Sequence, residues 1–144
     1  MWLYQNKVIE EINQFPEGTF GFIYRITRLS DGKFYIGRKN LYSERTKPLT
    51  KKEISEQTGK GRRPTKKKVV AESDWKRYFG SNPTLKADLK ELGEDAFKRE
   101  ILHLCDHKKQ MTYQELRYQI LNGCLESENS WNDNILGKFF KKDS

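Results

Sequence analysis

The sequence predicts a small α+β fold in which a three-stranded antiparallel β-sheet is flanked by helices. Strand-like and helix-like patterns follow one another as a hairpin, a pair of short helices, a third strand and a last helix. The chain has 144 residues, which suits one domain, so residues 1–144 are treated as a single unit. Hydrophobic residues make up 35% of the chain and charged residues 33%, which predicts a modest core under a largely solvated surface.

The N-terminal stretch, residues 2–13, has the apolar spacing of a short amphipathic helix. This helix should end before the turn-forming run Phe15-Pro16-Glu17-Gly18. The chain lacks the basic start and apolar stretch of a signal peptide, and it lacks an apolar run long enough to span a bilayer. We therefore expect a protein that stays in the compartment where it is made, the cytoplasm.

A β-hairpin is predicted over residues 19–28 and 33–39, because two runs of aromatic and β-branched residues flank an Asp-Gly pair. With a two-residue turn, Tyr24 lies opposite Lys39, and side-chain alternation places Tyr24, Tyr35 and Lys39 on one face. A three-residue loop would put the two tyrosines on opposite faces. Whether they can act at one site is therefore a question of register, and the Asp-Gly turn favours the shared face.

The formal net charge of +8 is concentrated in residues 45–68. This segment holds ten Lys or Arg and two Glu, whereas the rest of the chain carries 18 basic and 18 acidic residues. So localised a surplus indicates a polyanion partner, with a solubilising loop as the alternative. We expect a long loop with one helical turn near residues 51–57, and residues 46–70 are the predicted polyanion-contacting insertion, DNA being the polyanion that the resemblance described below implies. With one arginine of the hairpin, the candidate DNA contacts under that resemblance are Arg38, Lys51, Lys52, Lys60, Arg62, Arg63, Lys66, Lys67 and Lys68.

Two helices are predicted after the basic segment. Ser73 can cap a short helix that carries Tyr78 and stops at Gly80. A second helix begins at Pro83, which suits a first turn, and ends at Gly93.

The C-terminal third supplies the last strand and the last helix. Residues 96–105 read as the third strand, and Thr112 suits the cap of a helix over residues 113–125. Cys105 and Cys124 form no CxxC pair, so we expect buried, reduced thiols. The tail is expected to pack back on the core through Trp131, Ile135 and Phe139.

The residues FIY at 22–24 and YIG at 35–37, separated by ten residues, resemble the paired signature of the GIY-YIG nuclease superfamily. The later stretches ESDWKRYFGS and FKREILHLC are similar to small phage-encoded members, and the resemblance covers most of the chain. One departure is that Phe22 stands at the first signature glycine, with Gly21 one residue early. The family fold, a small α/β sandwich around a three-stranded antiparallel sheet, agrees with the elements predicted above. The resemblance implies hydrolysis of DNA phosphodiesters with one divalent metal ion, Mg²⁺ or Mn²⁺.

The resemblance also implies roles for the tyrosines. Tyr24 would help to activate the attacking water, as a general base, and Tyr35 would position water and substrate. Because a phenol has a pKa of about 10, a base role needs a cationic neighbour. Lys39 could supply that charge from the opposite strand; the alternative is a solvated lysine at a sheet edge. Tyr78 would take the family's His-or-Tyr position.

The remaining site residues come from the same alignment. The family's phosphate-clamping arginine falls on Arg45 by count from the second signature, with Arg77 as the competitor. Glu115, on the helix after the third strand, is the implied metal ligand, and water and phosphate would complete the coordination that Mg²⁺ tolerates. The family's late asparagine corresponds to Asn132, with Asn134 as the runner-up.

These inferences predict a metal-dependent DNA endonuclease of the homing or restriction-like type, acting on double-stranded DNA without a small-molecule cofactor. A phage-encoded enzyme of this kind would work in the cytoplasm of the host cell. The alternative is a non-catalytic DNA-binding module on the same scaffold, against which the joint presence of Tyr24, Tyr35 and Glu115 argues. A third reading is an RNA-binding protein that stacks bases on exposed aromatic side chains and needs no metal.

Overall fold

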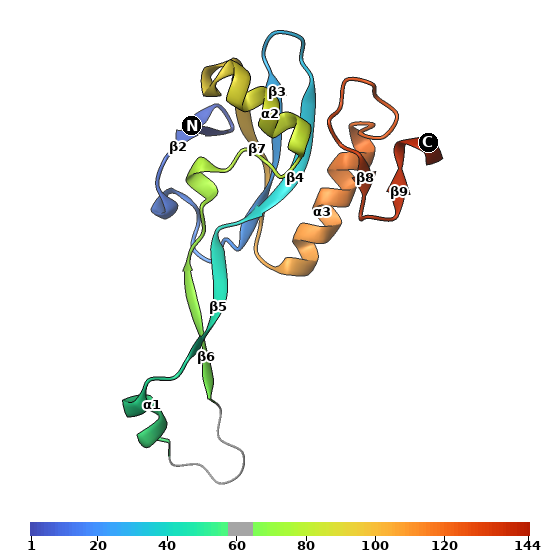
Figure 1. Cartoon of the computed structure of the whole chain (residues 1–144). Helices are drawn as coiled ribbons and strands as arrows, with labels where there is room; N and C mark the ends of the chain where they lie inside the picture. The colour runs from blue at the N-terminus through green and yellow to red at the C-terminus, as the bar shows by residue number, and fades with distance from the viewer. Residues whose placement is uncertain (58–64) are drawn as a thin grey trace.

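The computed structural model describes residues 1–57 and 65–144 (Figure 1). The main sheet of this part of the chain consists of β1 (Trp2–Tyr4), β2 (Lys7–Ile9), β3 (Gly21–Arg28), β4 (Phe34–Asn40) and β7 (Phe97–Cys105). The strand order is β2-β1-β7-β3-β4, and neighbours are antiparallel except for the parallel pair β1 and β7. The α+β class is confirmed. The predicted three-stranded sheet is the antiparallel trio β7-β3-β4 within a larger, mixed sheet.

The other elements cover the sheet or project from it (Figure 1). They are η1 (Ile12–Gln14), β5 (Tyr42–Pro48), α1 (Lys51–Ser55), β6 (Lys66–Glu72), η2 (Trp75–Arg77), α2 (Pro83–Leu92), η3 (Glu94–Ala96), α3 (Lys108–Leu121), β8 (Asn134–Ile135), β9 (Phe139–Phe140) and η4 (Lys141–Asp143). Among the described residues, no helix has the length and apolar character needed to cross a membrane.

A hydrophobic core lies on each face of the sheet. Trp2, Phe22, Tyr24, Trp75 and Leu85 belong to the larger core. The smaller core, next to α3, contains Ile23, Phe34, Ile36, Cys105, Met111 and Cys124. Both cysteines are free and buried, as predicted.

The helix predicted over residues 2–13 is wrong. The chain instead forms the hairpin β1-β2, and the turn residues Gln5 and Asn6 have positive φ angles of 49° and 66°, as a tight hairpin turn requires. Trp2 is buried, and its Nε1 donates to the carbonyl oxygen of Trp75 at 2.7 Å. A contact 73 residues away along the chain therefore decides the structure of this stretch.

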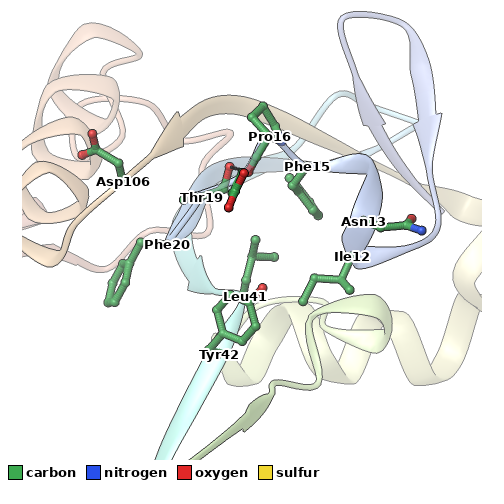
Figure 2. Close-up of a pocket in the computed structure, with 11 residues that line it drawn as sticks. Ile12, Asn13, Phe15, Pro16, Thr19, Phe20, Leu41, Tyr42 and Asp106 are labelled. Atoms are coloured by element: carbon green, nitrogen blue, oxygen red, sulfur yellow. Dashed lines mark hydrogen bonds between the residues drawn. The ribbon is translucent and has the colours of Figure 1, made fainter.

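The residues after η1 line a cavity of about 720 Å³ at the start of β5 (Figure 2). Phe15, Pro16 and Leu41 contribute apolar walls, with Asp106 at one side. The cavity shares no residue with the tyrosine and glutamate positions predicted above.

The hairpin β3-β4 has the predicted shared face but a different register. Tyr24 pairs with Gly37 and Tyr35 pairs with Ile26, so both tyrosines project from one side of the sheet. The predicted pairing of Tyr24 with Lys39 is wrong, because the loop has four residues, 29–32, instead of two. Backbone hydrogen bonds enclose this loop, from the Arg28 nitrogen to Lys33 oxygen at 2.7 Å and from the Gly32 nitrogen to Arg28 oxygen at 2.8 Å.

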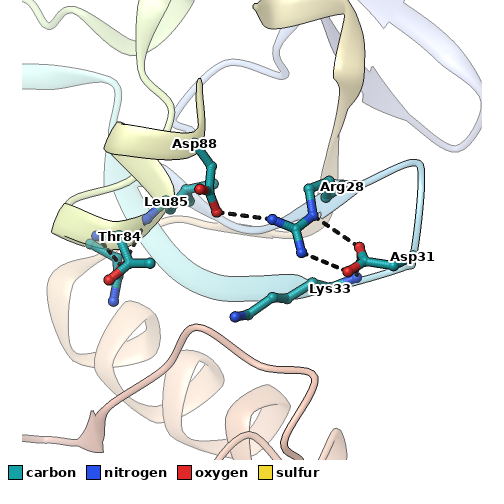
Figure 3. A network of polar contacts seen from close by, with 7 residues as sticks. Arg28, Asp31, Lys33, Thr84, Leu85 and Asp88 are labelled. Carbon is teal, nitrogen blue, oxygen red and sulfur yellow. Dashed lines mark hydrogen bonds and ion pairs between the residues drawn. The ribbon is translucent and has the colours of Figure 1, made fainter. Parts of the chain in front are cut away.

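An ion-pair network fixes this loop against α2 (Figure 3). Arg28 donates to both carboxylate oxygens of Asp31, at 3.0 and 2.6 Å, and to Asp88 of α2 at 3.0 Å. The hydrogen bonds from Arg28 hold the pKa of Asp31 down, at about 2. The longer loop is thus held by a bidentate pair that the Asp-Gly signal alone does not predict.

The two α-helices against the sheet differ in how well their ends were predicted. α2 begins at Pro83 and ends before Gly93, as predicted, with the Asn82 side chain accepting from the backbone of Thr84 and Leu85. α3 begins earlier than predicted, because the His107 side chain accepts from the backbone nitrogen of Gln110 and caps it. Thr112, the predicted cap, lies within α3 and donates to the carbonyl oxygen of Lys108.

The basic segment is not a long loop. β5 and β6 form an antiparallel ribbon that projects from the body of the molecule, with α1 near its far end (Figure 1). The predicted helical turn near residues 51–57 is confirmed as α1, which Thr50 and Glu53 cap reciprocally. Three predicted DNA contacts, Lys60, Arg62 and Arg63, lie outside the described residues.

Two further local predictions need correction. Ser73 does not cap η2, because its hydroxyl donates to the carbonyl oxygen of Asn40 at 2.6 Å. In the tail, Trp131 and Ile135 are buried as predicted, but Phe139 is 54% exposed. β9, which carries Phe139, pairs only with β8 among the described strands, so its side chain does not reach the core.

Arg99 of β7 is a buried cation that holds the η2 segment in place. Its Nη1 donates to the carbonyl oxygens of Lys76 at 3.0 Å and Tyr78 at 2.9 Å, and its guanidinium lies over the rings of Trp2 and Phe79. Arg99 is 5% exposed, and no described carboxylate forms an ion pair with it. Burial lowers the pKa of Arg99 to about 10.

Replacing Arg99 by Met should lower the free energy of unfolding by about 2–3 kcal/mol, because methionine keeps the apolar contacts but leaves two carbonyl groups without their charged donor. Urea unfolding measures this change. The exposed Arg117→Met on α3 is the matched control and should stay within about 0.5 kcal/mol of wild type. An Arg99→Met variant as stable as wild type would show that desolvating the guanidinium costs as much as its hydrogen bonds contribute.

Candidate active site

Three tyrosines pack together on one face of the sheet. Tyr24 is 1% exposed, and its ring centroid lies 6.2 Å from that of Tyr35 and 5.8 Å from that of Tyr78. The Tyr24 and Tyr78 rings are nearly perpendicular, at 85°. Opposite Tyr24, the pairing of β3 with β7 shifts register, which is a local irregularity of the ladder. We call Tyr24, Tyr35 and Tyr78 the tyrosine cluster.

Gly37, the glycine of YIG, makes this cluster possible. A Cβ added at Gly37 would lie 2.6 Å from the Tyr24 hydroxyl oxygen and 2.8 Å from Tyr24 Cζ, and it would lie 3.0 Å from Tyr35 Cε1. All three distances are shorter than ordinary van der Waals contact. The glycine is therefore required by the close approach of two rings, one from each strand.

A cavity of about 290 Å³ opens beside the tyrosine cluster. Tyr35 reaches it from β4, where its hydroxyl lies 3.3 Å from Ser81 Oγ. Glu115 reaches it from α3, and Asn132 and Asn134 come from the C-terminal segment. The cavity thus brings together the predicted positioning tyrosine, the predicted metal ligand and both asparagine candidates.

Asn132 holds the C-terminal segment on the edge of the sheet. Its Oδ1 accepts from the backbone nitrogen of Ile36 at 3.0 Å, and its Nδ2 donates to the Ile36 carbonyl oxygen at 2.8 Å. β4 is an edge strand, so these backbone groups would otherwise lack a ladder partner. Asn132 therefore closes the sheet edge directly below the cavity, and its amide is committed to the backbone.

Glu115 is a half-buried carboxylate, with 19% of its side chain exposed. Burial raises its pKa, and the positive charge of Arg38, whose Nε lies 3.8 Å away, opposes that shift. Arg38 also donates to the hydroxyl of Thr112 at 2.7 Å. The site therefore holds a partly desolvated carboxyl group with one loosely placed cation beside it.

The donor set of this cavity fits a hard divalent cation. Carboxylate, amide and hydroxyl oxygens line it, from Glu115, Asp133, Asn134 and Ser81. Within the described residues, no three His, Cys, Asp or Glu side chains gather as a complete ligand cage. Mg²⁺ prefers oxygen ligands and keeps several waters when one or two carboxylates bind it. Glu115 is the side chain that would hold such an ion here.

Tyr24 and Tyr35 have raised pKa values and are therefore protonated at neutral pH. Burial raises the pKa of Tyr24 well above 10, and the neighbouring phenols of Tyr78 and Tyr35 add to the shift. Burial also raises the pKa of Tyr35, against the effect of its hydrogen bond with Ser81. Both hydroxyl groups can therefore donate a hydrogen bond, and between Tyr35 and Ser81 either oxygen can be the donor.

Lys39 lies beside Tyr78 instead of Tyr24. Its Nζ is 4.1 Å from the centroid of the Tyr78 ring and 2.5 Å from Asp74 Oδ1. The hydrogen bond from Lys39 lowers the pKa of Asp74. Lys39, which was expected opposite Tyr24, therefore contacts the tyrosine cluster at the ring of Tyr78.

The two arginine candidates do not line the cavity. Arg45 is exposed on β5, opposite Val69, and Arg77 is exposed in η2. The arginine in contact with Glu115 is Arg38, which the sequence placed among the DNA contacts. No signal in the sequence indicated this contact, because it depends on how α3 packs against β4.

Sequence reasoning missed Ser81 and Asp133 as neighbours of the site. Ser81 follows Gly80, whose positive φ of 84° turns the chain toward Tyr35, and Asp133 follows Asn132.

The other predicted DNA contacts lie on the projecting elements. Lys51 and Lys52 belong to α1 and Lys66, Lys67 and Lys68 to β6.

Residues 2–139 match the family model described as "Putative endonuclease segE, GIY-YIG domain". Comparison with curated proteins gave no match. Comparison with solved structures gave none either.

Proposed function

The chain belongs to the segE family of GIY-YIG endonuclease domains, and on that premise we propose that it is a metal-dependent endonuclease of double-stranded DNA. The observation that supports this proposal best is the cavity shared by Tyr35 and Glu115, 80 residues apart in sequence, with Tyr24 packed against Tyr35 and Tyr78 packed against Tyr24. The basic ribbon supplies the positive surface that a DNA backbone needs. A phage homing or restriction-like enzyme is the proposed type.

Hydrolysis of a phosphodiester requires an oriented water and stabilisation of the charge on the phosphate. Tyr35 presents its hydroxyl to the cavity and can orient either the water or a phosphate oxygen. Tyr24, whose ring packs against that of Tyr35, is the proposed general base: it would accept a proton from the attacking water as its own phenolic proton passes to the neighbouring Tyr78 hydroxyl, and the proton of Tyr78 passes to solvent. Lys39, held by its ion pair with Asp74, lies over the ring of Tyr78 on this side of the site.

One Mg²⁺ or Mn²⁺ ion, held by Glu115, would supply Lewis-acid stabilisation of the phosphate oxygens. Arg38, next to Glu115 and 39% exposed at its side chain, is our proposed phosphate clamp, because a guanidinium binds phosphate oxygens in a bidentate manner. Arg45 and Arg77, the arginines predicted by alignment, are the competing proposals. Replacing each of the three by Lys and comparing cleavage rates distinguishes them.

A plasmid-cleavage assay tests the function directly. The wild-type chain should convert supercoiled DNA to relaxed or linear product with Mg²⁺ and should leave it intact with EDTA. A chain that shifts DNA on a gel but never cuts it, across several templates and both metals, would be the non-catalytic DNA-binding module. Preference for single-stranded RNA without metal would support the RNA-binding reading instead.

Tyr35→Phe should reduce the cleavage rate by about a hundredfold, because it removes one hydrogen-bond donor from the site. The ring is kept and only the contact with Ser81 is lost, so thermal stability should change little. Tyr113→Phe, on the exposed part of α3, is the matched control and should cut like wild type. Wild-type cleavage by Tyr35→Phe would remove this hydroxyl from the mechanism.

A further inference from the structure

The ribbon formed by β5 and β6 has two different faces. Residues that pair across an antiparallel ribbon project to the same side. One side, which we call the open face, carries Tyr42, Glu44, Thr46, Pro48, Lys66, Lys68, Val70 and Glu72. The other side, the helix-backed face, carries Ser43, Arg45, Lys47, Lys67, Val69 and Ala71. On the helix-backed face, Lys67 Nζ lies 2.8 Å from both carboxylate oxygens of Glu53 in α1.

The ribbon has no core of its own. None of its residues is buried, and an isolated two-stranded hairpin is marginally stable in water. Lys47 and Lys67 stand directly opposite each other, which is unfavourable for like charges. Glu53 neutralises Lys67, whereas Lys47 makes no ion pair with any described residue. The arrangement is suited to a polyanion that supplies the missing negative charge.

The ribbon's size suits one particular feature of duplex DNA. A strand of seven residues spans roughly 20 Å at about 3.4 Å per residue. The major groove of B-DNA, about 12 Å wide, admits a two-stranded ribbon, whereas the minor groove is about half as wide. The ribbon projects clear of the body (Figure 1), so nothing in the described fold blocks such an approach.

A cavity of about 790 Å³ lies where the ribbon meets the body of the molecule. Tyr42, Glu44 and Val70 of the open face line it, together with Arg38, Lys39 and Lys108 of the body. Arg38 is also the neighbour of Glu115. Three basic side chains of the body, one of them beside Glu115, therefore lie next to the base of the ribbon, where Ser43 of the helix-backed face also lines the cavity.

We propose that the ribbon enters the major groove of double-stranded DNA and reads base edges with its open face. Lys68 and Thr46 can hydrogen-bond to base edges there, and Val70 can contact a thymine methyl group. Arg45 and Lys47, on the helix-backed face, grip the flanking phosphates. This inference rests on the proposed function for its substrate. It adds the groove that is bound and the residues that read it. It also adds a position: the ribbon spans roughly 20 Å along the groove, so the sequence that it reads lies within about six base pairs to one side of the cut.

The test is a binding experiment with the full-length wild-type chain in EDTA, so that cleavage plays no part. Selection from a random duplex library should yield a preferred sequence, and 7-deazaguanine in that sequence, which removes a major-groove acceptor, should weaken binding about tenfold. Methyl green, a major-groove ligand, should compete with the protein, and netropsin, a minor-groove ligand, should not. Competition by netropsin alone, or the lack of any preferred sequence, would overturn the proposal.

Two pairs of variants separate reading from gripping. Thr46→Ala with Lys68→Ala should change the preferred sequence while binding to random DNA falls only a few-fold. Arg45→Gln with Lys47→Gln should weaken binding to all sequences and reduce the slope of log K against log salt by about 2. Lys90→Gln, exposed on α2, is the control and should change neither. Identical effects of the two pairs would refute the assignment of the faces.

The outcomes also separate this inference from the proposed function. A chain that reads sequence through the ribbon but never cuts a plasmid would retain the inference and lose the nuclease proposal. If both ribbon variants cut DNA with Mg²⁺ at the same sites and rates as wild type, the nuclease proposal would be retained and this inference would be lost.

Discussion

Replacing Glu115 by Gln should make the protein more stable at pH 7 and unable to cut DNA. Burial raises the pKa of Glu115 in the folded chain. A carboxyl group with a raised folded pKa contributes stability below its unfolded pKa and loses that contribution as the pH rises through the folded value. At pH 7 the wild-type chain therefore bears the cost of a partly desolvated charge, and glutamine, of the same shape, does not.

The pH dependence distinguishes this cause from a general packing effect. The stability difference between Glu115→Gln and wild type should be largest near pH 7 and should vanish below about pH 3, where the wild-type carboxyl is protonated in both states. Urea unfolding at a series of pH values measures it. Glu91→Gln, an exposed glutamate of α2, is the matched control and should show no such trend. A difference that is constant with pH would contradict the electrostatic explanation.

A divalent metal should reverse the order of stability. Mg²⁺ at ten times its Kd should stabilise the wild-type chain by about 1.4 kcal/mol, and it should not stabilise Glu115→Gln. Thermal unfolding with Mg²⁺, Mn²⁺ or EDTA measures this binding without reference to activity. Loss of the ligand should reduce cleavage about a thousandfold, since the metal supplies several kcal/mol of charge stabilisation. Equal metal stabilisation of both chains would remove Glu115 as the ligand.

Elements decided by local signals were predictable, and elements decided by distant contacts were not. The ends of α2 follow from Pro83 and Gly93, which act on their own backbone. Residues 2–13 contain apolar spacing that fits a helix, but the strands β1 and β2 form because Trp2 bonds to Trp75 and pairs beside β7. The ribbon was read as a loop because lysine runs are rare in strands, and the cross-strand pairing that forms it is non-local.

The candidate site shows the same division. Tyr24 and Tyr35 share a face because any register shift of two residues preserves side-chain alternation, so this prediction survived a wrong loop length. Which residue faces Tyr24 depended on the register itself, and there the prediction of Lys39 was wrong. The meeting of Glu115 with Tyr35 depends on how α3 packs at the sheet edge, and only the family resemblance indicated it. Arg38 was missed as a site residue because an alignment counts positions and does not see contacts.

Gly37→Ala should disrupt the packing of the tyrosine cluster and lower both the free energy of unfolding and the cleavage activity. Two effects of opposite sign compete here. Alanine in a strand stiffens the unfolded chain, which stabilises a protein by about 0.4–1 kcal/mol. The added methyl group, however, would meet Tyr24 at 2.6 and 2.8 Å, and forcing a methylene into a packed core costs about 1–3 kcal/mol. Tyr24 is enclosed by Trp2, Phe22 and Tyr78 and cannot move aside, so the clash should win and the variant should be less stable in urea.

A double-mutant cycle identifies the clash as the cause. Tyr24→Phe removes the hydroxyl oxygen, which is the atom nearest to the added methyl group. The double variant Gly37→Ala with Tyr24→Phe should therefore recover part of the stability lost in Gly37→Ala, with a coupling energy of about 0.5–3 kcal/mol. Cleavage should stay low in the double variant, because the Tyr24 hydroxyl is absent and Tyr35 is still displaced by the methyl group. Additive losses would show that alanine acts on the backbone of β4, in which case the YIG glycine serves the strand and not the approach of the two rings.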